Sequence, residues 1–416
     1  MNNQGYKIHI IGAGVSGLIA AKVLEDNGYT AVVIEATDRA GGRVKTDIVS
    51  GYQLDHGFQV LLTAYPAAQK YLDFEDLDLQ KILPGASIFK NSKQKIIGDP
   101  IKDLSLLFST LFSGIGNFSD KLKILKLNNS LKRKSISAIF SDKEQSTYSY
   151  LTGFGFSDEI ITDFFKPFFS GIFLETELET SSRMFEFIYK MFGEGYAAIP
   201  KAGIEAIPKQ LVSNLKQTSF KFNTKVAAIK DREITLEDKT KLESDFTIIA
   251  TEASDLIPNF KNKSTKWKSC CTLYFETRSR EVKMALIGLI PQNGTLINNI
   301  FYHTSIETFT NSAKELLSVT VIDNQNLSNE MLIIQVEREL KEYCGIGSCK
   351  FIKQYNIPMA LPQLNKLQYE MFPSQTLLTS SIFLSGDTQL NGSLNAAIIS
   401  GERAALGVID AIINNI

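Results

Sequence analysis

The chain of 416 residues has little of three things that would place it in a specialised class. Its four cysteines are too few for a disulfide scaffold and fit a reducing compartment. Lysine and arginine number 44 and aspartate and glutamate 45, so the net charge of −1 lacks the basic excess of a dedicated nucleic-acid-binding protein. No stretch approaches the roughly 20 consecutive apolar residues of a membrane-spanning helix.

The first six residues are polar and lack the apolar region of a signal peptide. We therefore expect a soluble, cytoplasmic protein. Residues 121–134 qualify this expectation, because they carry six basic residues and no acidic one, with apolar residues between them. This composition is typical of a solvated helix face, but it leaves open peripheral contact of residues 101–134 with an anionic membrane.

What the sequence does contain is a complete βαβ pattern at its start. Residues 7–11 predict a buried strand, residues 16–27 a helix and residues 30–35 a second strand. Gly12, Gly14 and Gly17 fall between the first strand and the helix. In a dinucleotide-binding loop, the first glycine permits the turn, the second lets a pyrophosphate approach, and the third allows the helix to pack on the strand.

A carboxylate completes this pattern. Glu35 ends the second predicted strand, where it can accept hydrogen bonds from an adenosine ribose. Gly41, Gly42 and Arg43 follow in the next loop, and the forked guanidinium of arginine suits phosphate. A glycine-rich turn without a ligand is the simpler alternative, but it does not account for the whole strand–loop–helix–strand–Glu arrangement.

With these residues, the sequence resembles the FAD-binding start of the flavin amine oxidoreductase superfamily, which includes amine oxidases, protoporphyrinogen oxidases and phytoene desaturase-like enzymes. The segment from Leu54 to Val60 resembles the part of that family that passes close to the flavin. Near the other end of the chain, Gly386 and Asp387, followed by a helix that begins near Ser393, resemble the family's C-terminal flavin motif.

The resemblance implies a set of cofactor-binding residues drawn from all of these segments. They are Gly12, Ala13, Gly14, Val15, Ser16, Gly17, Glu35, Ala36, Gly41, Gly42, Arg43, Val44, Gly57, Phe58, Gln59, Val60, Val226, Ala250, Gly386, Asp387, Ser393, Leu394, Asn395 and Ala396. Val226 is expected to offer its backbone to the adenine. Ala250 ends another predicted strand, residues 245–251, and a strand residue without ligand contact explains it about as well.

The three cofactor segments are separated by two long insertions. We therefore predict an α/β protein with a Rossmann-like FAD-binding domain and a mixed helical and β-sheet substrate domain. Residues 1–69, 195–265 and 375–416 would form the discontinuous FAD-binding domain, and residues 70–194 and 266–374 the substrate domain. The first insertion is predicted to be mostly helical, with a stripe formed by Leu104, Leu107, Phe108, Leu111, Ile115 and Phe118.

No second GxGxxG follows a predicted strand and opens a helix, so a separate nicotinamide site is not expected. Electrons would then pass to oxygen, a quinone or an unknown acceptor. Some family members bind FAD covalently through a cysteine near the C-terminal motif. Residues 355–386 contain no cysteine, so the resemblance implies noncovalent FAD. We expect no metal site, because Cys344 and Cys349 have no further ligands clustered nearby.

Several other residues have two interpretations. His56 lies where the family's chain nears the flavin and can donate a hydrogen bond there, whereas His9 and His303 are expected to be structural. Lys266 and Lys268 are expected to be solvated charges on either side of Trp267. The phenylalanine-rich residues 164–173 and 185–192 are either core or the wall of an apolar channel.

These features predict an FAD-dependent oxidoreductase that removes hydride from a C–N or C–C bond of a largely apolar small molecule. No catalytic side chain is assigned, because the flavin accepts the hydride and the protein mainly orients the substrate. A flavin-dependent isomerase or mutase without net redox chemistry, and a binding protein on the same fold, are the alternatives.

Overall fold

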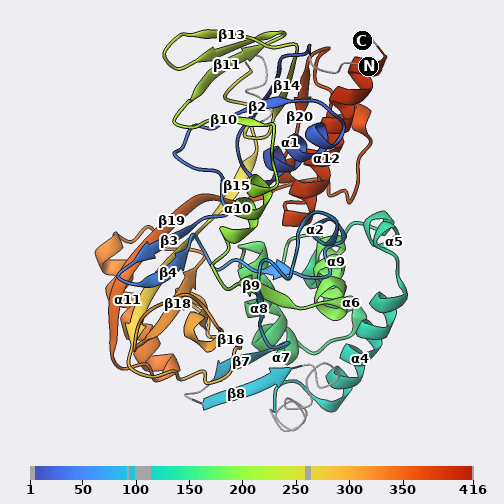
Figure 1. Cartoon of the computed structure of the whole chain (residues 1–416). Helices are drawn as coiled ribbons and strands as arrows, with labels where there is room; N and C mark the ends of the chain where they lie inside the picture. The colour runs from blue at the N-terminus through green and yellow to red at the C-terminus, as the bar shows by residue number, and fades with distance from the viewer. Residues whose placement is uncertain (1–4, 91–92, 99–113, 258–263, 415–416) are drawn as a thin grey trace.

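The computed structural model describes residues 5–90, 93–98, 114–257 and 264–414. A parallel five-stranded sheet, in the order β10-β2-β1-β14-β20, forms the centre of the upper part of the molecule in Figure 1. Its strands are β1 (Ile8–Ile11), β2 (Ala31–Ile34), β10 (Ser219–Lys221), β14 (Phe246–Ile249) and β20 (Ile382–Leu384). The sheet unites strands from the beginning, middle and end of the sequence.

Two helices from opposite ends of the chain pack beside this sheet. They are α1 (Val15–Asp26) and α12 (Leu394–Ile413). A Cβ atom added to Gly401 of α12 would lie 2.3 Å from the backbone oxygen of Ser16, so only glycine permits this helix contact. The pairing brings the N-terminal and C-terminal motifs together. Above the sheet, β11 (Val226–Lys230), β12 (Glu233–Leu236) and β13 (Lys241–Glu243) form an antiparallel sheet (Figure 1).

The lower part of the molecule contains a seven-stranded sheet in the order β19-β15-β18-β17-β16-β7-β8. Its long strands β15 (Lys266–Thr277) and β19 (Cys349–Gln363) pair antiparallel. The other strands are β18 (Glu315–Val321), β17 (Ile297–Tyr302), β16 (Ile287–Leu289), β7 (Gly85–Lys90) and β8 (Lys93–Gly98). The helix α11 (Asn329–Cys344) packs its apolar side chains into the core of this sheet.

The first insertion is mostly helical, as predicted, but its first part forms strands. It begins with three strands, β6 (Leu79–Lys81), β7 and β8; β7 pairs antiparallel with β8 and in parallel with β16 of the second insertion. Helices follow from residue 118 onward: α4 (Phe118–Arg133), α5 (Ile136–Ser141), α6 (Thr147–Phe154), α7 (Asp158–Ile160), a π-helical turn (Ile161–Phe165), α8 (Lys166–Phe173) and α9 (Ser182–Glu194). Both insertions therefore contribute to one mixed sheet.

Two smaller sheets connect the halves of the molecule. The hairpin β3 (Thr46–Val49) and β4 (Tyr52–Asp55) follows the Gly41–Arg43 loop, and the strands β5 (Leu61–Leu62) and β6 pair with β9 (Ala197–Pro200). The helices α2 (Pro66–Tyr71) and α10 (Ala206–Ser213) lie next to them. No helix of the described residues is long and apolar enough to span a membrane.

The predicted stripe lies only partly within the described residues. Leu104, Leu107, Phe108 and Leu111 lie outside them. Of the remaining two residues, Ile115 is fully buried, whereas Phe118 at the start of α4 is exposed. Among the described residues, Ile115 and Phe118 therefore do not share a buried helical face.

Candidate functional site

The glycine loop between β1 and α1 has the backbone that the motif predicts. Gly12 has a φ of +104°, and a Cβ atom added to Gly17 would lie 2.1 Å from the backbone oxygen of Gly12. No heavy atom lies within 4 Å of a Cβ atom added to Gly14, so the backbone is open at this point. The loop therefore exposes the start of α1, where free amides and the helix dipole favour phosphate.

Glu35 follows β2 and is buried beside this loop. Its carboxylate accepts hydrogen bonds from the backbone amides of Ala13, at 2.8 Å, and Thr37, at 2.9 Å. The carboxylate therefore fixes the glycine loop while retaining lone pairs for ribose hydroxyls. The backbone oxygen of Glu35 also accepts the amide of Thr224, which places the start of β11 and Val226 next to it.

The loop at Gly41–Arg43 packs directly on the glycine loop. The amide of Gly41 donates to the backbone oxygen of Ala13 at 2.9 Å, and a Cβ atom added to Gly42 would lie 3.2 Å from the Cα atom of Gly14. The side chain of Gln59 donates to the backbone oxygen of Arg43 at 2.9 Å. The loop therefore touches both the N-terminal motif and the segment at residues 57–60.

Arg43 connects the two ends of the chain. Its Nη2 atom lies 2.5 Å from Oδ1 of Asp387, and its guanidinium lies 5.1 Å from the ring centroid of Trp267. Asp387 is buried, whereas Arg43 is exposed. The ion pair joins two of the three charged groups predicted to bind FAD. Its exposed guanidinium is also available to an anionic ligand.

The C-terminal motif is held by hydroxyl groups from three segments. The Ser16 hydroxyl hydrogen-bonds to those of Ser385 and Ser400, and Ser400 accepts the amide of Gly386 at 3.0 Å. Gly386 has a φ of +129°, which favours glycine. Ser393 caps α12 by accepting the amide of Ala396 at 3.0 Å. The motif is thus attached to the start of α1.

Two further residues of the predicted C-terminal motif are buried in the protein. The side chains of Asn395 and Ala396 are fully buried, and Oδ1 of Asn395 accepts the amide of Ala67 at 3.0 Å. This bond fixes the start of α12 to α2. Ala250 follows β14, and its backbone oxygen would lie 3.0 Å from a Cβ atom added to Gly12. The structure gathers these residues around the loop, and their contact with FAD stays a prediction.

Residues 56–60 lie between the two halves of the molecule. Nε2 of His56 lies 3.0 Å from Oδ2 of Asp47, which also accepts the Tyr355 hydroxyl at 2.9 Å. Although burial raises the pKa of Asp47, the bonds from Tyr355, His56 and Arg39 together hold it well below its usual value. Asp47 and Tyr355 are partners of His56 that no local sequence pattern indicates.

An apolar cluster lies next to the same segment. The Phe58 ring lies 4.9 Å from that of Phe301, and the cluster also contains Ile82, Ile199 and Val60. Ile199 belongs to β9 and Phe301 to β17 of the seven-stranded sheet. The cluster therefore gives the segment at residues 57–60 an apolar side, opposite the polar contacts of His56.

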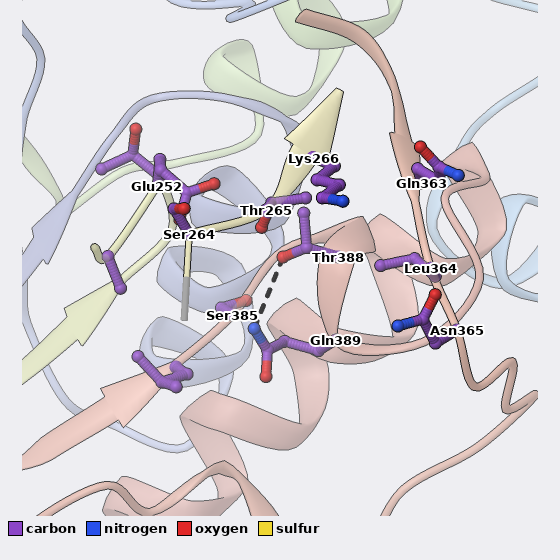
Figure 2. A pocket seen from close by; sticks show the side chains of 13 residues that line it. Glu252, Ser264, Thr265, Lys266, Gln363, Leu364, Asn365, Ser385, Thr388 and Gln389 are labelled. Carbon is purple, nitrogen blue, oxygen red and sulfur yellow. Dashed lines mark hydrogen bonds between the residues drawn. The ribbon is translucent and has the colours of Figure 1, made fainter. Parts of the chain in front are cut away.

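A polar cavity of about 410 Å³ opens at the carboxyl ends of β14 and β20. Figure 2 shows Glu252, Lys266, Ser385, Thr388 and Gln389 around it. Ligands of open parallel sheets bind at this end of the strands. The cavity adjoins the predicted Gly386 and Asp387 but is lined by residues that the motifs do not include. The sequence could have indicated this cavity only through the position of Glu252, which directly follows a predicted strand.

One expectation about a side chain is wrong, and one pair of interpretations is decided. Lys268 is not a solvated charge, because its Nζ atom lies 2.5 Å from Oε2 of Glu175 and 2.9 Å from the backbone oxygen of Phe173. Lys266 is exposed, as expected. Most of the phenylalanine-rich segments are core rather than the wall of a channel, since Phe165, Phe169, Phe173, Phe185 and Phe187 are fully buried.

The histidines and cysteines expected to be structural are buried or partly buried. His9 bonds with Ser244 and His303 with Ser318. Burial lowers the pKa of each histidine to about 4. Cys344 and Cys349 are both free thiols, and burial raises their pKa values to about 12 and 11. No group of three potential metal ligands occurs among the described residues.

The charged and hydrogen-bonding groups of the site fit FAD. A buried carboxylate at a strand end suits ribose hydroxyls, and open backbone at a helix start, with an arginine beside it, suits the diphosphate. The fold and this site define the class of α/β dinucleotide-binding proteins. Residues 15–409 match the model of the family described as flavin-containing amine oxidoreductases, so the chain belongs to that family.

Individual relatives agree with the family. Protoporphyrinogen oxidase 2 of Arabidopsis thaliana is 27% identical over 170 residues, which cover 40% of this chain and 32% of the relative. An L-amino-acid oxidase of Bothrops moojeni is 31% identical over 155 residues, which cover 35% of this chain and 31% of the relative. The chain thus aligns with about a third of the length of these curated relatives.

The solved structure of an oxidoreductase from Methanosarcina mazei shares the whole fold. Its TM-score is 0.74 at 17% identity, and the match covers 97% of this chain and 100% of that chain. These comparisons confirm the predicted family, the α/β fold class and FAD as the cofactor. The family comprises flavin-containing oxidoreductases, the class of enzyme that the sequence predicts.

Proposed function

We propose that the protein removes hydride from a C–N or C–C bond of a largely apolar small molecule and passes the electrons to oxygen or a quinone. The observation that carries this proposal is the convergence of Glu35, Arg43 and Asp387 from distant segments on one dinucleotide site. A binding protein without a cofactor would not need this charged set. When bound, FAD supplies the hydride acceptor.

The chain's own residues would bind and orient the two reactants. Glu35 and the start of α1 would hold the adenosine diphosphate half, and the Arg43–Asp387 pair would lie along the connection to the ring. The segment at residues 57–60 would lie next to the ring, as the family resemblance implies. Its apolar side, formed with Phe301, would exclude water from the reacting bond.

The apolar character of this cluster supports the substrate class. Phe58, Val60 and Phe301 offer no ionic partner, and desolvating an unpaired charge is unfavourable. Lys268 is already paired with Glu175. The names of the relatives cover both a porphyrinogen and an amino acid as substrates. The choice of an apolar substrate therefore rests on the residues of this chain.

Anaerobic reduction of the bound flavin tests the proposal. The FAD-loaded protein is mixed with apolar amines, with polyenes and, as a polar comparison, with amino acids. We expect an apolar compound to bleach the flavin absorbance, and subsequent addition of oxygen or a quinone to restore it. Bleaching by amino acids alone would reject the apolar substrate.

The same preparation tests the alternatives. Conversion of a compound without any electron acceptor would favour an isomerase, and a protein that refuses FAD would favour a binding function. Acid precipitation should release the flavin into the supernatant, because we propose noncovalent attachment. Yellow colour that stays in the pellet would contradict that attachment and leave the reaction class intact.

A further inference from the structure

The helix α4 at the outer edge of the helical insertion is firmly held on one face (Figure 1). Leu127 and Leu131 are fully buried, and Asp120 is buried on the same face, where it accepts the amide of Ser157 at 2.9 Å. Nζ of Lys190 in α9 donates to the backbone oxygen of Leu131 at 2.9 Å. The orientation of the helix, and hence of its other face, is therefore fixed.

The opposite face of α4 exposes large apolar side chains. Phe118 is 74% exposed, Leu122 52% and Leu125 44%. At about 100° per residue, the three lie within an arc of about 60° on the helix surface. Single exposed apolar residues are ordinary, but three on one line of a helix form a continuous patch. We call these three residues the apolar stripe of α4.

Basic side chains flank the apolar stripe on both sides. On the same helical projection, Lys121 and Lys132 lie on one side, and Lys126 and Arg133 on the other. The one acidic residue of α4, Asp120, is buried on the far face. Among the described residues, Lys126, Lys132 and Arg133 form no ion pair. Positive charge is thus concentrated here, although the net charge of the whole chain is −1.

We propose that this face of α4 docks on a bilayer that contains anionic phospholipids. Apolar side chains flanked by lysine and arginine are typical of helices that lie in the plane of a membrane interface, with the apolar side towards the acyl chains and the basic groups at the phosphates. A nucleic acid would engage the basic residues but would leave the apolar stripe in water. An acidic bilayer satisfies both kinds of side chain.

Sedimentation with lipid vesicles tests this assignment without reference to turnover. The FAD-loaded protein is mixed with vesicles of phosphatidylcholine and with vesicles that also contain phosphatidylserine. We expect binding to the second kind, weakened by salt because exposed charges are screened. The double variant Leu122→Glu and Leu125→Glu should bind at least tenfold more weakly. Lys132→Glu with Arg133→Glu should remove the preference for phosphatidylserine.

A matched control comes from α11, which has the same length as α4. Its residues Met331 and Ile334 are 53% and 58% exposed, so Met331→Glu with Ile334→Glu makes the same change elsewhere. This variant should bind vesicles as the unchanged protein does. Circular dichroism and flavin absorbance verify the fold of each variant.

Three results would overturn the proposal. The first is an unchanged protein that stays in the supernatant with both kinds of vesicle. The second is an α4 variant that binds as well as the α11 variant. The third is a protein that does not bind vesicles and dimerises in solution until Leu122 and Leu125 are replaced, which would make the stripe an interface between two copies of the chain.

Discussion

The helices α1 and α4 use apolar residues in opposite ways. Nine of the 12 residues of α1 are buried, whereas only three of the 16 residues of α4 are. Small residues such as Gly17 allow α1 to lie against β1 and α12, while α4 directs Phe118 and Leu122 into solvent. The helix α1 is therefore packed over most of its surface, whereas α4 keeps one face free.

Substitutions on the buried and the exposed face of α4 should give the largest difference in stability. Leu127 is fully buried and Leu125 is 44% exposed on the same helix. Leu127→Ala should lower the free energy of unfolding by about 2–5 kcal/mol, because it leaves a cavity. Leu125→Ala should change it by less than about 0.5 kcal/mol. Urea unfolding of both variants measures the difference, and equal losses would show that the outer face is packed.

Acidification should lower the stability of the folded protein through His9, which is buried. His9 lies in β1, and burial lowers its pKa to about 4, from about 6.5 in an unfolded chain. Between these pH values the unfolded chain binds more protons, so stability falls as the pH falls. This group alone should contribute a loss of roughly 3 kcal/mol between pH 7 and pH 4.

The variant His9→Gln isolates this contribution. The loss of stability on acidification should be smaller than in the unchanged protein, and unfolding midpoints at several pH values measure it. His303 remains in the variant, and it also lowers the stability as the pH falls. Asp55 acts in the opposite direction. Burial raises its pKa to about 6, so its contribution to stability increases as the pH falls. Identical pH profiles for the two proteins would contradict the role of His9.

The contact between α1 and α12 allows a test of close packing. Gly401→Ala places a methyl group 2.3 Å from the backbone oxygen of Ser16, so the helices must move apart. We expect a loss of about 1–3 kcal/mol in the free energy of unfolding and weaker retention of FAD. Thermal unfolding and flavin absorbance after gel filtration measure the two effects.

Gly193 in α9 is the matched control, since no heavy atom lies within 4 Å of a Cβ atom added there. Gly193→Ala should leave FAD retention unchanged and raise stability by up to about 1 kcal/mol, as expected for alanine in a helix. If both alanine variants behaved alike, the packing of α1 against α12 would not depend on Gly401.

Local patterns predicted the strands and helices next to the glycine motifs well, because the conformation of these glycines and strand ends is dictated by nearby backbone geometry. The strands around Gly12 and Gly386 and the helix α12 are close to their expected positions. Contacts between distant segments were not predictable in this way. Lys268 contacts Glu175, which is 93 residues away, and the pairing of β7 with β16 joins two distant insertions.

The aromatic segments illustrate a different limit. Their composition suits a core and a channel equally, and only burial in the folded chain separates the two. The α4 segment has a similar ambiguity, because basic and apolar residues alternate in its sequence. The fold resolved it by burying Leu127 and Leu131 and leaving Leu122 exposed.

The central claim is that both ends of the chain hold one FAD molecule, and titration of the apoprotein with FAD tests it most directly. Glu35→Ala and Asp387→Ala should each weaken binding at least tenfold, or about 1.4 kcal/mol. Glu25→Ala is the control, because this carboxylate also accepts backbone amides but lies away from the site. It should leave the affinity unchanged. Unchanged affinity in either the Glu35 or the Asp387 variant would contradict the claim.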